Sequence, residues 1–259
     1  MKKLHDFAIE LSHRAGDLLM KGFRSQSLNI AYKSRTDLVT SMDNASEELI
    51  VSAIHGLYPD HSIIAEEGRG FTGSGDYIWY VDPLDGTNNY AHGIPIFCVS
   101  LGVYSRSTGK VLCGVVHDPN NKETFSALHN KGAWLNGSAI SVSETKTPGY
   151  GIVATGFPYD KENPAVNNVD RFQKIVPHVQ GIRRFGSAAL DLCFVACGRI
   201  DGYWEGELKP WDLAAGSLIV QEAHGQVTRF NGEAFDVTRG EVCATNGAIH
   251  HQLLALLSY

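Results

Sequence analysis

The stretch from Trp79 to Tyr90, Trp-Tyr-Val-Asp-Pro-Leu-Asp-Gly-Thr-Asn-Asn-Tyr, constrains this chain more than any other part of its sequence. The apolar residues at its start are typical of the end of a buried strand. Two carboxylates follow, three residues apart, at Asp82 and Asp85. Pro83 restricts the backbone between them and Gly86 is free to adopt a positive φ, so the loop can bend around one point. The stretch predicts a cation site.

Oxygen ligands alone suit magnesium or manganese better than zinc, and the backbone carbonyl of Leu84 can join the two carboxylates. A surface turn is the alternative, because Asp-Pro and Asp-Gly pairs are frequent in turns. The loop by itself does not decide between the two, so a metal site requires further ligands elsewhere in the chain.

Further acids occur where predicted strands end or a predicted helix begins. Glu66 and Glu67 follow the apolar strand predicted over 62–65, and Glu205 ends another over 202–205. Asp212 lies in the first turn of a helix that opens after a proline. Open α/β sheets place their sites at the carboxyl ends of strands, so we expect Glu66, Glu67 and Asp212 to share one site with Asp82 and Asp85. Solvated loop charge is the alternative for each of them taken singly.

The remaining pattern alternates amphipathic or apolar helices with short strands. The polar segment 32–40 is expected to be an extended or mobile arm, and Asp43 occupies a helix N-cap position. Antiparallel strands joined by turns are predicted over 97–104, 111–116 and 123–128. Other strands are predicted over 151–155, 226–230 and 241–245, and helices over 4–23, 44–57, 164–178, 187–197, 211–224 and 248–257.

Composition excludes several classes of function. The chain of 259 residues contains neither a run of about 18 apolar residues nor a secretory leader pattern, so we expect a soluble, cytoplasmic protein without a membrane partner. The five cysteines include no Cys-x-x-Cys pair, which favours a reduced state. A net charge of −6 without a basic stripe argues against nucleic acid as a partner. An anionic substrate would then need bound cations.

Taken together, these motifs resemble those of the inositol monophosphatase family, magnesium-dependent and lithium-sensitive sugar phosphatases. The family pattern is met by Glu66-Glu67, by the six residues from Asp82 to Thr87, and by Trp211-Asp212-Leu213-Ala214-Ala215-Gly216. Leu84 replaces the usual isoleucine. The resemblance spans essentially the whole chain and implies an α/β (α+β) fold, a layered αβαβα sandwich. It implies one domain over 1–259, with a metal-site lobe (about 1–145) and a substrate-specificity lobe (about 146–259) as a finer division.

The resemblance also implies roles for individual residues. Thr87 would orient the attacking water, Asp43 would accept its proton, and Glu67 would support the catalytic group. Lys33 matches the family's mobile arm. The implied ligands of two or three magnesium ions, which manganese can replace, are Glu66, Asp82, the Leu84 carbonyl, Asp85 and Asp212.

Substrate contacts are implied in the same way. Glu205 would bind polyol hydroxyls, and a tight turn opening a short helix would present N–H groups to the phosphate. Arg183 and Arg184 either serve a second phosphate or flank a helix in solvent. The full set of implied contacts is Glu66, Leu84, Asp85, Gly86, Thr87, Gly186, Ser187, Ala188, Glu205 and Asp212.

The expected activity is hydrolysis of a phosphate monoester, with inositol 1-phosphate as first choice. Histidinol phosphate, fructose 1,6-bisphosphate and nucleotide 3′-phosphates are the alternatives within the same chemistry. A non-catalytic regulatory binding protein is the alternative from another class, although every implied catalytic position is filled. A homodimer is expected from the family alone.

Overall fold

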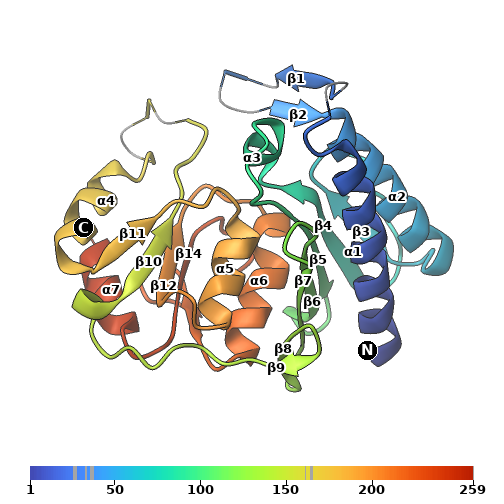
Figure 1. The fold of residues 1–259 in the computed structure, drawn as a ribbon. Coiled ribbons are helices and arrows are strands. Elements are labelled where there is room, and N and C mark those ends of the chain that lie inside the picture. The colour runs from blue at the N-terminus through green and yellow to red at the C-terminus, as the bar shows by residue number, and fades with distance from the viewer. Residues whose placement is uncertain (26–27, 33, 36–37, 161, 164–165, 259) are drawn as a thin grey trace.

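The computed structural model describes residues 1–258 except 26–27, 33, 36–37, 161 and 164–165, so Lys33 lies outside the described residues. Helices and sheets alternate in five layers across the molecule (Figure 1). The predicted αβαβα sandwich is confirmed. One sheet is built from residues 62–139 and the other from residues 152–245.

The first sheet is a seven-stranded meander in the order β3-β4-β5-β6-β7-β8-β9. Only the β3–β4 pair is parallel, and every later pair is antiparallel. The predicted meander is confirmed, and two short strands extend it. The strands are β3 (Ser62–Ala65), β4 (Tyr77–Asp85), β5 (Cys98–Ser105), β6 (Lys110–Asp118), β7 (Glu123–Leu128), β8 (Gly132–Leu135) and β9 (Ser138–Ala139).

Two helices, α1 (Lys2–Gly22) and α2 (Ser41–Leu57), cover the outer face of this sheet (Figure 1). Their apolar faces bury Leu11, Leu19 and Ile50 against Trp79 of β4, which is fully buried. Between the helices the chain forms a hairpin of β1 (Ile30–Tyr32) and β2 (Leu38–Thr40). Within the predicted arm, Tyr32 and the residues Leu38–Thr40 are therefore extended and paired.

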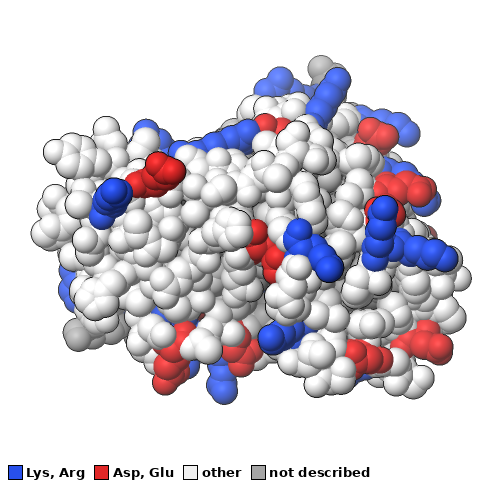
Figure 2. Space-filling model, turned by 90° about the horizontal axis from the view of Figure 1, so that it is seen from below, with Lys and Arg blue, Asp and Glu red and all other residues white. Residues whose placement is uncertain are grey.

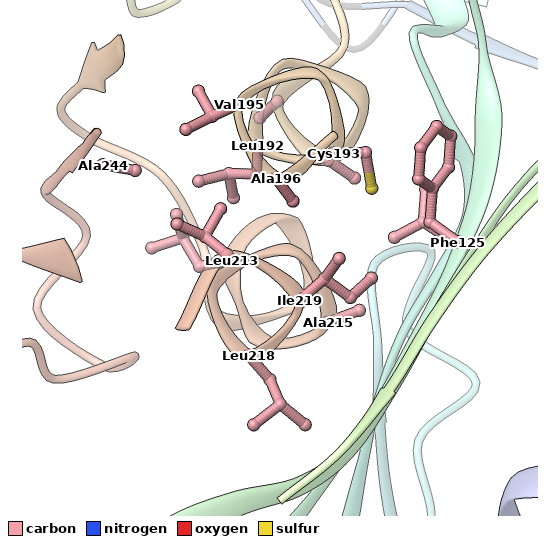
Figure 3. Close-up of a cluster of buried hydrophobic side chains, with 14 of the residues drawn as sticks. Phe125, Leu192, Cys193, Val195, Ala196, Leu213, Ala215, Leu218, Ile219 and Ala244 are labelled. Atoms are coloured by element: carbon pink, nitrogen blue, oxygen red, sulfur yellow. The ribbon is translucent and has the colours of Figure 1, made fainter. Parts of the chain in front are cut away.

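The central layer consists of α5 (Ala188–Ala196) and α6 (Pro210–Glu222), packed between the two sheets. Figure 3 shows the apolar core that these helices share with β7 and β14. The helix α6 approaches the first sheet closely, because a Cβ atom at Gly114 would lie 2.7 Å from the Ala215 carbonyl oxygen. The small residues Ala214, Ala215 and Gly216 at the start of α6 permit this approach.

The second sheet has five strands in the order β11-β10-β12-β14-β13. Its outer face is covered by α4 (Val169–Ile175) and α7 (His250–Leu257) (Figure 1). The predicted start of a helix at 164 lies outside the described residues. The prediction was wrong for residues 166–168, because Asn168 has φ of +64° and α4 begins only after it. The strands are β10 (Ile152–Thr155), β11 (Gly181–Arg183), β12 (Gly202–Glu205), β13 (Gln226–Thr228) and β14 (Val242–Thr245).

Three single turns complete the described elements: α3 (Thr87–Ala91) and the 3₁₀ turns Pro148–Tyr150 and Val176–His178. None of the described helices combines the length and apolarity that a membrane crossing requires. On the face seen in Figure 2, positive and negative side chains are interspersed.

Candidate active site

The two carboxylates of the opening motif lie within β4, whereas the sequence placed them in a loop after it. The pairing of β4 with β5 shifts register between Asp82 and Asp85, where Pro83 has no N–H to donate. The buried Asp82 accepts a hydrogen bond through Oδ1 from the Leu84 N–H at 3.0 Å. The irregularity turns both acids toward one end of the sheet.

Asp85 joins the first sheet to the central helices. Its Oδ2 accepts hydrogen bonds from the Ser187 hydroxyl and from the Ala189 N–H, both at 2.7 Å. The Ala188 N–H donates to the same carboxylate. Ser187 is the N-cap of α5 and also accepts from the Leu190 N–H. Negative charge is favoured at a helix N-terminus, so α5 holds this carboxylate in place.

Thr87 stands between an acid and a backbone carbonyl. Its Oγ1 lies 3.0 Å from Asp43 Oδ1 and 2.9 Å from the Leu84 carbonyl oxygen. A hydroxyl has one proton, so it donates to one of these acceptors at a time. Gly86, with φ of +94°, makes the turn that starts α3 at Thr87.

Asp43 is buried and is not the N-cap of α2, which corrects the sequence prediction. Thr40 is the cap, and Asp43 lies three residues further on. Its Oδ2 accepts hydrogen bonds from the Thr40 N–H at 2.8 Å and from the Thr40 hydroxyl at 2.6 Å. Burial raises the pKa of Asp43 to about 6, against these hydrogen bonds, and the charge of Glu67 adds to the rise. A carboxyl with this pKa can exchange a proton near neutral pH.

The turn at Glu66 and Glu67 is held by Glu47, which the sequence analysis did not identify. Glu47 of α2 is fully buried, and its carboxylate accepts the Glu67 N–H at 2.7 Å and the Arg69 N–H at 2.9 Å. Its four-residue spacing from Asp43, on the face that also buries Ile50, was the available signal.

The remaining two acids come from the other side of the site. Asp212, in the first turn of α6, accepts the Lys209 N–H at 2.7 Å. Glu205, at the end of β12, accepts the Tyr203 hydroxyl at 2.6 Å. A Cβ atom at Gly156 would lie 2.0 Å from Glu205 Oε2, so only glycine leaves room for this carboxylate.

These elements surround a cavity of about 390 Å³, a size typical of small-molecule sites. Asp43 and Glu67 do not line the cavity, but a hydrogen bond links Asp43 to the Thr87 hydroxyl, which does. Every other predicted site residue lines the cavity: Glu66, Asp82, Leu84, Asp85, Gly86, Thr87, Gly186, Ser187, Ala188, Glu205 and Asp212.

The carboxylates around the cavity repel one another. Burial is the largest cause of the raised pKa of Asp82 and of Asp212, and the charge of Glu66 is the next cause for both. Burial raises the pKa of Asp85 above its ordinary value, although its hydrogen bonds at the start of α5 offset part of the rise. Glu205 has a pKa raised to about 7, again chiefly by burial. Bound cations would relieve this repulsion.

The donor set fits magnesium. It consists of carboxylates and one backbone carbonyl, the ligands that hard cations prefer, and includes neither thiolate nor imidazole. Within the described part of the chain, no three Asp, Glu, His or Cys side chains are arranged so that they could bind one metal ion together. The acids therefore mark out a region for cations, whose ligands would come from Glu66, Asp82, Leu84, Asp85 and Asp212.

Both arginines are exposed but differ in position. Arg183 is the last residue of β11, whereas Arg184 lines the cavity three residues before the N-cap of α5. Asp191 of α5, which the sequence analysis did not identify as a site residue, also lines the cavity.

Comparison with known proteins finds similarity over the whole chain. The sequence model described as "Inositol monophosphatase family" matches residues 1–258. The chain is 42% identical to Phosphatase IMPL1, chloroplastic, of Arabidopsis thaliana, covering 95% of this chain and 68% of that protein. It is 44% identical to an Inositol-1-monophosphatase of Synechocystis sp., covering 86% and 77%. It is 40% identical to the Nus factor SuhB of Pasteurella multocida, covering 98% and 95%.

Solved structures agree with this result. The extragenic suppressor protein suhB of Bartonella henselae superposes with a TM-score of 0.93 at 34% identity, covering 99% of this chain and 98% of that one. An inositol monophosphatase from Anabaena superposes with a TM-score of 0.89 at 38% identity, covering 99% and 95%.

Proposed function

Because this chain belongs to the inositol monophosphatase family, whose members are phosphoric monoester hydrolases, we propose that it hydrolyses inositol 1-phosphate to inositol and phosphate. The observation that carries the proposal is the position of Thr87. Its hydroxyl contacts the buried Asp43 on one side and lines the acid-walled cavity on the other. A water at the cavity end of this pair could be oriented and deprotonated in one place.

In the proposed mechanism, Thr87 orients the attacking water and Asp43 accepts its proton. A threonine hydroxyl is too weak a base to act alone, but it can hold a water in line with the phosphorus atom. Asp43 accepts the proton through the Thr87 hydroxyl, and its pKa of about 6 leaves it ionised at neutral pH. Glu67 keeps negative charge near Asp43, which favours uptake of the proton.

Magnesium is the metal of this family, and the cations would be held by the four acids and the Leu84 carbonyl. When bound, they would neutralise the phosphate dianion and lower the pKa of water. The chain's own contribution is to position these ligands. Asp85 is held by the N-terminus of α5, and Asp212 by the Lys209 N–H. The turn at Gly86 would present N–H groups to the phosphate oxygens.

Selection of the alcohol is assigned to the wall of the cavity that β12 and the start of α5 provide. Glu205 faces the cavity from β12, and the backbone of Gly186, Ser187 and Ala188 lies at the start of α5. A carboxylate accepts two hydroxyl hydrogen bonds, which suits a ring with neighbouring hydroxyl groups. Arg184 lines the same wall and can donate to a hydroxyl or to a second phosphate.

A phosphate-release assay with and without magnesium tests the proposal. The substrates are inositol 1-phosphate, histidinol phosphate, fructose 1,6-bisphosphate and a nucleotide 3′-phosphate. Asp85→Asn should abolish magnesium-dependent release, while Asp118→Asn, a buried acid outside the cavity lining, should retain it. Full activity in Asp85→Asn would refute the metal assignment. Fast release from histidinol phosphate, with none from inositol 1-phosphate, would refute the substrate.

Several relatives carry the name Nus factor SuhB, so a role beyond hydrolysis is the second candidate. The filled set of catalytic positions supports hydrolysis as the first. The homodimer and the absence of a nucleic-acid partner stay predictions. Analytical ultracentrifugation tests the first of them, and an electrophoretic mobility assay tests the second.

A further inference from the structure

The helix α5 carries one charged residue, Asp191, in an otherwise apolar sequence. The residue lies about one turn after the helix start, where Ser187 and the following N–H groups hold Asp85. Only 1% of Asp191 is exposed, yet the residue borders the candidate active-site cavity. Its Oδ1 is buried and accepts no hydrogen bond in the described structure.

An unpartnered buried carboxyl oxygen is costly, and buried polar atoms are paired in the great majority of native structures. The flanking residues Leu190 and Leu192 are fully buried, so a leucine at position 191 would fit the helix pattern equally well. No hydrogen bond to Oδ1 within the described structure accounts for a carboxyl group at this position. The cavity that it borders is the place from which a donor can come.

The neighbouring groups indicate what that donor is. Glu205 lies close enough for its charge to act on Asp191, and so does Arg184. All three residues border the same cavity. Two carboxylates accept hydrogen bonds from hydroxyl groups, and a guanidinium donates to hydroxyl oxygens. This combination is complementary to an alcohol with several hydroxyl groups on one ring.

We propose that Asp191 determines specificity for the alcohol part of the substrate, because its Oδ1 accepts a hydrogen bond from a hydroxyl of a polyol phosphate. The inference rests on the proposed function and deepens it. Glu205 and Asp191 bind different hydroxyls, one from the end of β12 and the other from α5. A phosphate ester whose alcohol has no further hydroxyl gains nothing from Asp191.

The test compares two substrates in two variants. Inositol 1-phosphate carries the polyol, and 4-nitrophenyl phosphate carries none. In Asp191→Leu, the ratio of their kcat/KM values should fall by about 10-fold, as expected for loss of one buried hydrogen bond. The Tm should equal or exceed that of the parent protein, because leucine replaces an unpartnered carboxyl by an apolar group of similar size. Asp191→Asn provides a second, milder variant if the leucine variant does not fold.

Asp201→Asn is the matched control, since Asp201 is also a buried acid but accepts hydrogen bonds from the Ser143 hydroxyl and the Ile152 N–H. It should lower the Tm and leave the substrate ratio as in the parent protein. A fall of both kcat/KM values together in Asp191→Leu, or a lower Tm with the same ratio, would show a structural role and overturn the inference. A selective loss of histidinol phosphate instead would assign Asp191 to an amine.

Binding of myo-inositol in the presence of magnesium and inorganic phosphate gives a readout that does not need turnover. Calorimetry should show a similar weakening of about 10-fold in Asp191→Leu. Equal binding by the parent protein and the variant would overturn the role of Asp191. Absence of phosphate release from every monoester would instead refute the proposed function, so the two failures are distinguishable.

Discussion

Glu47→Gln is the most informative single substitution away from the cavity, because it loosens the turn that carries Glu66. Glu47 is fully buried and accepts two backbone N–H groups from that turn. Glutamine keeps the size of the side chain and one acceptor oxygen. Its amide NH₂ replaces the other oxygen and then faces the N–H of either Glu67 or Arg69.

The expected cost follows from these two hydrogen bonds. A hydrogen bond to a charged acceptor contributes about 1.5–3 kcal/mol, and glutamine retains a weaker form of one of them. We therefore expect the free energy of unfolding to fall by about 2–3 kcal/mol. Partners that orient metal ligands typically change metal affinity by about 10- to 100-fold when mutated, so the magnesium concentration at half-maximal activity should rise by a factor in that range.

Urea unfolding and magnesium titration of phosphate release at pH 8 measure the two effects. The pH is chosen because burial raises the pKa of Glu47, and the carboxyl should be ionised in the comparison. Glu48→Gln is the control, since the neighbouring Glu48 side chain is 65% exposed and lies 3.6 Å from Arg69. If Glu47→Gln matched Glu48→Gln in both assays, the turn would not depend on Glu47 and the reasoning would be wrong.

Two further predictions concern pH. With the pKa of Asp43 raised to about 6 in the free protein, kcat/KM should fall as pH drops through 6, because the proton acceptor becomes protonated. Asp43→Asn should lose most of its activity and this acidic limb, and retention of the limb would contradict the assignment. Burial lowers the pKa of His250 to about 4, and its ring nitrogens lie 2.9 Å from the Thr228 and Thr245 hydroxyls. Below about pH 6.5 the unfolded chain binds a proton at this histidine, whereas the folded chain binds it only near pH 4. As the pH is lowered from about 6.5 to about 4, the free energy of unfolding should therefore fall by up to about 1.4 kcal/mol per pH unit. Urea unfolding should show a shallower pH dependence for His250→Gln, and identical slopes would contradict this account.

Part of the site could be predicted from the sequence, because each motif is formed by residues that lie close together in the chain and have strong chemical preferences. The spacing of Asp82 and Asp85 around Pro83, with a glycine next to them, predicted a bend that brings two acids together, and the register shift in β4 provides it. The apolar helix that opens at Ser187 was equally clear, because its hydrophobicity is nearly continuous.

Errors arose where a residue's role depends on partners far along the chain. Asp43 has the residue type and position of an N-cap, but Thr40 precedes it and takes that role. Its hydrogen bond with Thr87 spans 44 residues and follows from packing of α2 against the end of β4. The sequence around either residue does not indicate a contact between residues so far apart in the chain. The late start of α4 similarly depends on a left-handed residue, Asn168, whose amide hydrogen-bonds to the Gly156 carbonyl and the Thr155 hydroxyl.

The sequence by itself determined the family, the layered fold class and the acids available for a cation site, since these follow from motif, periodicity and residue chemistry. Only the tertiary structure decided that Glu47 holds the Glu66 turn and that Asp191 borders the cavity without a partner. The physical reason is that burial and hydrogen-bond pairing are set by contacts between distant segments. The cost or use of a buried carboxyl group depends on those contacts and not on its neighbours in sequence.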